Sequence, residues 1–241
     1  MIPEMLEREA LLIGNDKVRR LMRSTVMVVG IGGVGASALE ALVRAGVGRV
    51  IAVDSDTVST TNINRQLIAD TTTVGMLKTE AARVRMQRIT PDLDFLSESL
   101  FVTRENVDGL IKKYMPDYII DAIDTISSKT ALIVSAKEHG VRVISSMGTG
   151  NKLDPEKLRL SDIYKTRVCP LARVMRRELK ENGIEKLTVL YSEEEPIRLE
   201  DGSAPVIKDN GRNAPGSISF VPSVGGLIIA SRVVRDLIEA E

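Results

Sequence analysis

Four glycines lie within the stretch GIGGVG, between the apolar run STVMVV and the Ala- and Leu-rich run ASALEALVRAG. The flanking patterns predict a strand before the glycines and a helix after them. Glycine lets the backbone approach a phosphate closely, and the N-terminus of the following helix offers N–H donors and a positive dipole end. We therefore predict a nucleotide site at Gly30, Gly32, Gly33 and Gly35.

Two acids lie at the end of the next predicted strand, RVIAVD, and just after it. Asp54 comes 24 residues after Gly30, at a position where a carboxylate commonly accepts the ribose hydroxyls of a nucleotide. Asp56 follows in the same VDSD stretch and is predicted to belong to the same site. Glycines and acids alone do not distinguish a mononucleotide from a dinucleotide such as NAD.

The polar residues that come next favour ATP. Asn62, Arg65 and Lys78 lie on the connection after this strand, which is expected to return across the C-terminal edge of the sheet. An arginine and a lysine near a nucleotide suit a triphosphate better than a nicotinamide, which needs a dry pocket for hydride transfer. Asp121 and Asp124, in DAID, end the fourth predicted strand at the same edge. A carboxylate there can hold Mg²⁺ that bridges phosphate oxygens.

Alternating strand and helix patterns position these residues. Strands are predicted at 25–30, 49–54, 94–100, 117–124 and 141–148, and segments of helical periodicity connect them. The alternation implies right-handed βαβ crossovers and an α/β, Rossmann-like, doubly wound and mostly parallel sheet with helices on both faces.

The pattern changes after residue 150. Strands are predicted at 157–163, 186–192 and 217–223, helices at 168–183 and 225–241, and a polar loop at 193–216. Because no linker separates the two halves, the chain is predicted to be one domain, 1–241. Its nucleotide-binding core is 1–150, and 151–241 is a C-terminal α/β extension on the substrate side.

Composition limits the other possibilities. The 33 Lys and Arg residues balance the 33 Asp and Glu residues, so any attraction for a polyanion must be local. A single cysteine excludes an internal disulfide and a multi-cysteine zinc site. No run approaches the roughly 20 apolar residues of a membrane span. MIPEMLEREALL has no signal-peptide pattern, so we expect a soluble, cytoplasmic protein.

The motifs resemble the ThiF/MoeB-type adenylating family, which is related to the ubiquitin-activating enzymes. GIGGVG, VDSD, NINRQ, the helix of Lys78 and DAIDT carry this resemblance, which spans roughly residues 8 to 150. It implies that ATP and Mg²⁺ are the cofactors. The implied contacts are Asp54 on the ribose, Asn62, Arg65 and Lys78 on the phosphates, and Asp124 on Mg²⁺.

The same resemblance implies a homodimer. Arg8, in the predicted helical segment EREALLIG, resembles the arginine that reaches the nucleotide of the partner subunit in this family. The alternative is a surface helix whose arginine contacts only solvent.

The second half resembles the tRNA threonylcarbamoyladenosine dehydratase branch of the family. NKLDPEKLRLSDIYKT, PLARVMRRELKENGI and the glycine-rich closing helix carry this resemblance. It implies cyclisation of threonylcarbamoyladenosine in tRNA, in which ATP adenylates the threonyl carboxylate. A carbamoyl nitrogen or oxygen of the same nucleoside then displaces AMP, so no side-chain nucleophile is required.

Three other activities stay open. Activators of ubiquitin-like sulfur-carrier proteins often use a cysteine, work with a sulfur-relay partner and carry CxxC zinc pairs. This chain has only Cys169, at the start of a predicted helix, where a thiol pKa can be lowered. An NAD-dependent oxidoreductase needs an acid–base pair, and His139 is the one histidine. A non-catalytic nucleotide sensor would not need Arg65, Lys78 and Asp124 together.

The predicted helix at 168–183 carries a basic stripe. Its cations recur at helical spacing, opposite a face of Val168, Leu171, Met175 and Leu179. The stripe consists of Arg173, Arg176, Arg177 and Lys180. An ordinary solvated face is one interpretation. In a neutral protein with an RNA substrate, we favour a local contact with tRNA phosphates.

Overall fold

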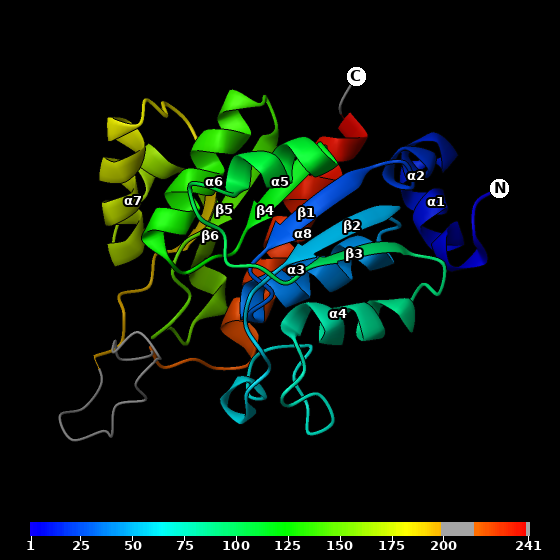
Figure 1. Ribbon diagram of the computed structural model, residues 1–241, viewed down its shortest axis with the longest axis horizontal. Helices are drawn as coiled ribbons and strands as arrows, with labels where there is room; N and C mark the ends of the chain where they lie inside the picture. The colour runs from blue at the N-terminus through cyan, green and yellow to red at the C-terminus, as the bar shows by residue number, and fades with distance from the viewer. Residues whose placement is uncertain (199–214, 240–241) are drawn as a thin grey trace.

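A seven-stranded sheet forms the centre of the part of the chain that the computed structural model describes, residues 1–198 and 215–239 (Figure 1). The strand order is β3-β2-β1-β4-β5-β7-β6, and only the β6–β7 pair is antiparallel. The bounds are β1 (Thr25–Val29), β2 (Arg49–Val53), β3 (Asp94–Glu98), β4 (Tyr118–Asp121), β5 (Arg142–Ser146), β6 (Leu158–Asp162) and β7 (Thr188–Ser192). The predicted α/β class with a mostly parallel sheet is confirmed.

Helices cover both faces of the sheet. One face carries α3 (Gly33–Arg44), α4 (Lys78–Gln87) and α8 (Phe220–Glu239), and the other carries α5 (Val107–Tyr114), α6 (Ile126–Glu138) and α7 (Pro170–Glu181). Val26 and Val28 of β1 pack into the first apolar layer, and Met27 and Val29 into the second. Burial on both faces explains why the central strands are continuous apolar runs and do not alternate apolar with polar residues.

Strand register brings the predicted site residues to one edge of the sheet. In β1, Val29 pairs with Val53 of β2 and with Asp121 of β4, so the three strands end side by side. The segments that begin at Gly30, Asp54 and Ala122 therefore leave the sheet next to one another. This is the carboxyl edge, where open α/β sheets bind ligands.

The N-terminal helices lie at the opposite end of the strands. They are η1 (Glu4–Leu6), α1 (Glu7–Ile13) and α2 (Asn15–Leu21), and they precede the first residue of β1 (Figure 1). Leu6 packs against the turn before β2, because a Cβ added at Gly46 would lie 2.7 Å from Leu6 Cδ1. These helices therefore cover the amino edge of the sheet.

The predicted strand at 217–223 is wrong, because α8 begins within it, at Phe220. Pro222 lies in the first turn of α8, where its missing N–H removes no intrahelical hydrogen bond. Its ring packs on the glycine loop: a Cβ added at Gly33 would lie 2.9 Å from Pro222 Cβ. The apolar run belongs to a buried helix start.

The remaining boundaries differ by a few residues. α7 begins at Pro170, so Val168 lies before the helix. Residues 199–214 of the predicted loop and 240–241 of the closing helix lie outside the described residues. Within the described ranges, no helix is both long and apolar enough to span a membrane.

Candidate functional site

The glycine loop turns sharply between β1 and α3. Gly30 has a φ of +89°, and a Cβ added there would lie 2.7 Å from the carbonyl oxygen of Ala122. A Cβ added at Gly35 would lie 1.8 Å from the carbonyl oxygen of Gly30. Because no side chain fits at either position, the sequence must place glycine there for the strand to enter the helix.

The outer side of this loop is open beside Gln66. Within the described residues, a Cβ added at Gly32 would meet only Gln66 Nε2, at 3.9 Å. Gln66 is buried, and its Oε1 has no hydrogen-bond partner among the described residues. Buried amide oxygens are normally paired, so the side-chain amide of Gln66, whose Nε2 faces the open glycine, keeps an unused hydrogen-bond acceptor within the described residues. The sequence signal for Gln66 was its position in the motif NINRQ, although the motif alone did not predict a role for this residue.

Asp54 ties the end of β2 to the glycine loop. Its Oδ2 accepts the N–H of Ile31 at 2.6 Å, and its Oδ1 accepts the N–H of Asp56 at 2.8 Å. Burial raises the pKa of Asp54, and the nearby Lys78 only partly offsets this effect. Two backbone N–H groups therefore hold the Asp54 carboxylate in place at the carboxyl edge of the sheet.

Lys78 is the first residue of α4 and is almost fully buried. Its Nζ lies 2.6 Å from Asp56 Oδ2 and 3.9 Å from Asp54 Oδ1. Asp56 is the exposed partner, with 65% of its side chain accessible. An anionic ligand can therefore compete with Asp56 for the ammonium group, while Asp54 stays in place.

Asn62 and Arg65 lie in the connection between β2 and α4. Asn62 ends η2 (Thr60–Asn62), and its Oδ1 accepts the N–H of Ser59 at 3.1 Å. The oxygen of Asn62 thus closes the turn, which leaves its amide N–H groups to donate to a ligand. Arg65 is half-buried and donates through Nη1 to the carbonyl oxygen of Thr61 at 2.7 Å and to Asn64 Oδ1 at 2.9 Å. Burial lowers the pKa of Arg65, although a guanidinium keeps its charge.

Asp124 and Asp121 differ in their surroundings. Asp124 is exposed on the loop between β4 and α6. Asp121 is fully buried against Lys129, so of the two predicted acids only Asp124 can reach a ligand. Within residues 1–198 and 215–239, no group of three or more His, Cys, Asp or Glu side chains is arranged to hold a metal ion. One exposed carboxylate suits Mg²⁺, which takes one or two carboxylates together with substrate phosphates.

Arg8 is exposed on α1, at the opposite end of the sheet from the glycine loop. The structure therefore separates Arg8 from the predicted site residues of its own chain. The other predicted nucleotide-site residues lie at the carboxyl edge: Gly30, Gly32, Gly33, Gly35, Asp54, Asp56, Asn62, Arg65, Lys78 and Asp124.

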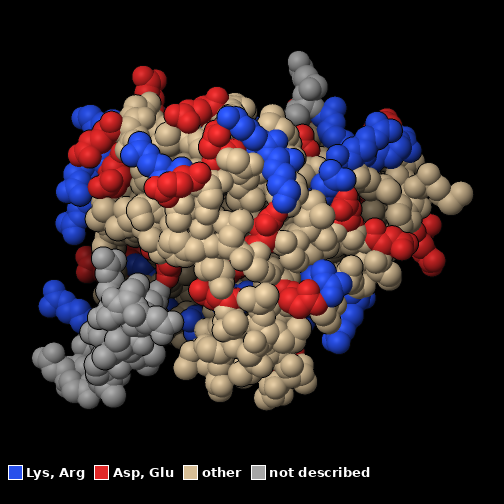
Figure 2. All heavy atoms as spheres, viewed as in Figure 1, with Lys and Arg blue, Asp and Glu red and all other residues tan. Residues whose placement is uncertain are grey.

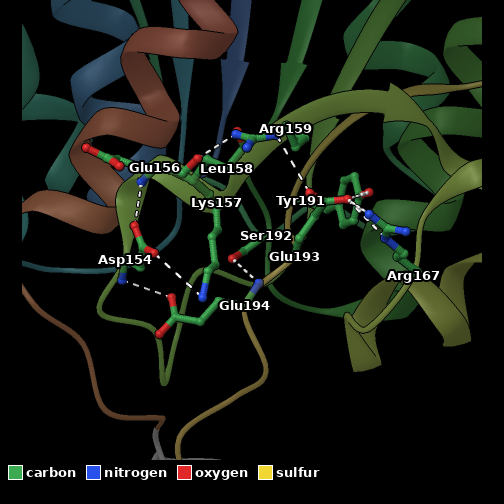
Figure 3. A network of polar contacts seen from close by, with 10 residues as sticks. All are labelled: Asp154, Glu156, Lys157, Leu158, Arg159, Arg167, Tyr191, Ser192, Glu193 and Glu194. Carbon is green, nitrogen blue, oxygen red and sulfur yellow. Dashed lines mark hydrogen bonds and ion pairs between the residues drawn. The ribbon is translucent and has the colours of Figure 1, made fainter.

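The extension adds a polar network next to β6 and β7 (Figure 3). The carboxylate of Glu194 accepts the N–H groups of Leu153 and Asp154, each at 2.9 Å. Glu193 accepts a hydrogen bond from Arg167 at 2.7 Å. The contacts of Glu194 fasten the chain that leaves β7 to the segment that follows β5. The contact of Glu193 fastens it to the segment just before α7.

The basic stripe on α7 has three solvent-facing members. Arg173, Arg177 and Lys180 are exposed, and Arg177 lies 3.1 Å from Glu178. The predicted fourth member, Arg176, is instead half-buried and donates to Thr166, at 3.0 Å to its carbonyl oxygen. Lys and Arg side chains gather along the edge where α7 lies (Figure 2).

Cys169 is the N-cap residue of α7 and is buried in an apolar cluster that includes Ala172 and Met175. Its thiol is closed to solvent. Reactive cysteines lie in partly exposed, electropositive surroundings. Cys169 has a cation nearby, because Lys152 interacts with it electrostatically, but both residues are buried.

Comparisons with known proteins match almost the whole length of the chain and its fold. The sequence profile of the ThiF family matches residues 6–235. The chain is 41% identical to a tRNA threonylcarbamoyladenosine dehydratase of Bacillus subtilis, over 96% of the chain and 94% of that protein. It is 32% identical to the enzyme of that name from Haemophilus influenzae, over 93% of the chain and 89% of that protein. A solved structure of the Escherichia coli enzyme in complex with ATP matches with a TM-score of 0.86 at 28% identity, over 97% of this chain and 93% of that one.

Proposed function

The chain belongs to the ThiF family, and we propose that it is an ATP-dependent tRNA threonylcarbamoyladenosine dehydratase. Dehydratases of this name match nearly the whole chain, and the E. coli enzyme binds ATP. The observation that carries the proposal is the carboxyl edge of the sheet. At this edge lie the open glycine loop, the fixed carboxylate of Asp54 and the cations Arg65 and Lys78.

The first step adenylates the substrate. The Asp54 carboxylate accepts hydrogen bonds from the ribose hydroxyls. The N–H groups at the start of α3 and the side chain of Asn62 bind the phosphates. Arg65 and Lys78 offset the phosphate charge. An oxygen of the threonyl carboxylate attacks the α-phosphorus, and the bond to pyrophosphate breaks. The protein contributes charge stabilisation and in-line alignment, which are the main sources of rate in phosphate chemistry.

The second step closes the ring. The carbamoyl nitrogen or oxygen of the same nucleoside attacks the acyl carbon and loses a proton, and AMP leaves. ATP is converted to AMP and pyrophosphate, while the nucleoside loses the elements of one water. The buried thiol of Cys169 fits a reaction whose second nucleophile is on the substrate.

Asp124 is the residue that would hold Mg²⁺. A metal ion held there would offset the charge that develops on the phosphate oxygens during the departure of pyrophosphate. Asp124 fits this role because it is exposed at the edge where the phosphates would lie.

Two copies of the chain complete the site. Leu11 and Leu12 of α1 are 88% and 84% exposed, which is unusual for adjacent large apolar residues in a monomer. Arg8 lies on the same helix and too far from its own glycine loop to act there. A partner subunit that covers α1 would bury these leucines and receive Arg8 at its nucleotide.

The extension, residues 151–241, would bind tRNA, and residues 1–150 would bind ATP. Arg173, Arg177 and Lys180 supply a local positive surface on a chain of zero formal net charge. A tRNA substrate also favours a cytoplasmic location.

The proposal is tested by pyrophosphate release. The protein with ATP and Mg²⁺ should release pyrophosphate only when tRNA carrying threonylcarbamoyladenosine is present. The same tRNA without that modification is the control. Release that ignores the modification, or tight binding of NADH with no binding of ATP, would overturn the proposal.

A further inference from the structure

A fully buried ion pair joins the ends of β4 and β5. Lys129 of α6 and Asp121 both have 0% side-chain exposure, and Lys129 Nζ lies 2.9 Å from Asp121 Oδ2. Nζ also donates to the carbonyl oxygens of Ile123, at 3.0 Å, and Ser146, at 2.9 Å. An ammonium group has three N–H donors, so every donor of Lys129 is used.

The same pair holds the backbone of Ile123 at both of its polar groups. Asp121 Oδ1 accepts the N–H of Ile123 at 3.1 Å, and Lys129 binds its carbonyl oxygen. Ser145 Oγ donates to Asp121 Oδ2 at 2.6 Å, which fixes the carboxylate in turn. Asp124 is the next residue after Ile123, so the network fixes the position of the backbone that leads into Asp124.

Stability alone does not explain this arrangement. The desolvation cost of two buried charges often equals or exceeds their attraction, and apolar replacements are frequently neutral or stabilising. What a buried pair with satisfied hydrogen bonds does supply is a single fixed geometry. That geometry is imposed on the loop that carries Asp124. The same loop includes Ala122, whose carbonyl oxygen lies against Gly30.

We propose that Lys129 and Asp121 are positioning residues that hold the loop of Asp124 so that its carboxylate meets a nucleotide-bound Mg²⁺. The inference rests on the proposed function, because it requires a Mg²⁺–ATP ligand. Neither residue touches ATP. Their effect is confined to the gain in ATP affinity that Mg²⁺ provides.

The test compares ATP affinity, measured by calorimetry, with Mg²⁺ and with EDTA. Lys129→Met combined with Asp121→Asn removes both charges, so that no unpaired buried charge remains. Binding in EDTA should change by less than about threefold, while the Mg²⁺-dependent gain should fall about tenfold or more, the usual effect of removing support behind a metal ligand. Asp124→Ala should lose the same gain.

A matched control removes the charges of another ion pair between two elements. Arg85→Met combined with Glu40→Gln breaks a 2.6 Å pair that joins α4 to α3. It should lower thermal stability and leave the Mg²⁺-dependent gain intact. If the Lys129/Asp121 variant only lowers the melting temperature and keeps the full gain, the pair is structural and the inference is wrong.

A milder variant covers the case in which the double variant fails to fold. Ser145→Ala removes only the hydroxyl that fixes Asp121, and it should still reduce the Mg²⁺-dependent gain; an unchanged gain there also overturns the inference. If the wild-type protein binds no ATP at all, the proposed function itself fails. If Mg²⁺ raises the ATP affinity of the wild type and of the variants equally, only the inference fails.

Discussion

Arg8 and Leu12 lie four residues apart on α1 and so share one face of that helix. Leu12 is 84% exposed, and within the described residues α1 contributes no buried side chain to its own chain. Because α1 packs so little on its own subunit and carries an arginine remote from its own site, it is suited to contact a partner subunit.

Subunit mixing tests whether Arg8 acts across a dimer. Arg8→Ala and Asp124→Ala should each be inactive alone, since an arginine finger is typically worth about 10³-fold or more in rate. When the two variants exchange subunits, each mixed dimer has one site with both defects and one with neither. Mixed dimers should therefore recover half of the wild-type rate of pyrophosphate release. If Arg8 serves its own chain, every site stays defective and no activity returns.

Asp124→Ala should separate catalysis from folding. The side chain is exposed on a loop, so the melting temperature should stay near the wild-type value. Pyrophosphate release should fall by about 100-fold or more, because Mg²⁺ loses its protein carboxylate. Asp92→Ala, at another exposed acid, is the matched control and should retain full activity. Wild-type turnover in Asp124→Ala would remove this residue from the mechanism.

Cys169→Ser should keep most of the activity. Serine is a preferred N-cap residue, and Cys169 occupies the N-cap of α7, so the helix should still form. The rate of cyclisation, measured on modified tRNA, should stay within a few-fold of wild type because the second nucleophile is on the substrate. A folded but inactive variant would instead support covalent or sulfur-transfer chemistry.

The basic stripe on α7 should affect the binding of tRNA and not the binding of ATP. Arg173→Ala, Arg177→Ala and Lys180→Ala together should raise the KM for tRNA and reduce the salt dependence of binding, by roughly one unit of slope per lost phosphate contact. Lys112→Ala, Lys113→Ala and Lys137→Ala together remove three cations from α5 and α6 and serve as the control. Equal effects of the two triple variants would show a general charge effect and no tRNA site on α7.

Periodicity and motif spacing predicted the parts of the molecule that depend on local sequence. The strands of the first half and the helices between them follow from apolar runs and helical spacing, and GIGGVG located the turn after β1. The run at 217–223 misled because its β-branched residues and Pro222 resemble a strand boundary, whereas packing on the glycine loop makes Phe220 the start of a helix.

Tertiary contacts account for what the sequence pattern did not predict. Arg176 has the spacing of a surface cation, and only the fold brings Thr166 within reach of its guanidinium. Asp121 and Asp124 look alike in DAID, yet the last residue of β4 points into the core and meets Lys129, 8 residues further along the chain. The orphaned oxygen of Gln66 likewise depends on how the loop folds against Gly32.

Mass spectrometry of the nucleoside tests the central claim most directly. The protein is incubated with ATP, Mg²⁺ and tRNA carrying threonylcarbamoyladenosine, and the tRNA is digested to nucleosides under mild conditions that preserve the ring. The account predicts a modified nucleoside lighter by one water, formed only when ATP is present and not formed by Asp124→Ala. An unchanged nucleoside mass, with folded wild-type protein that binds ATP, would contradict it.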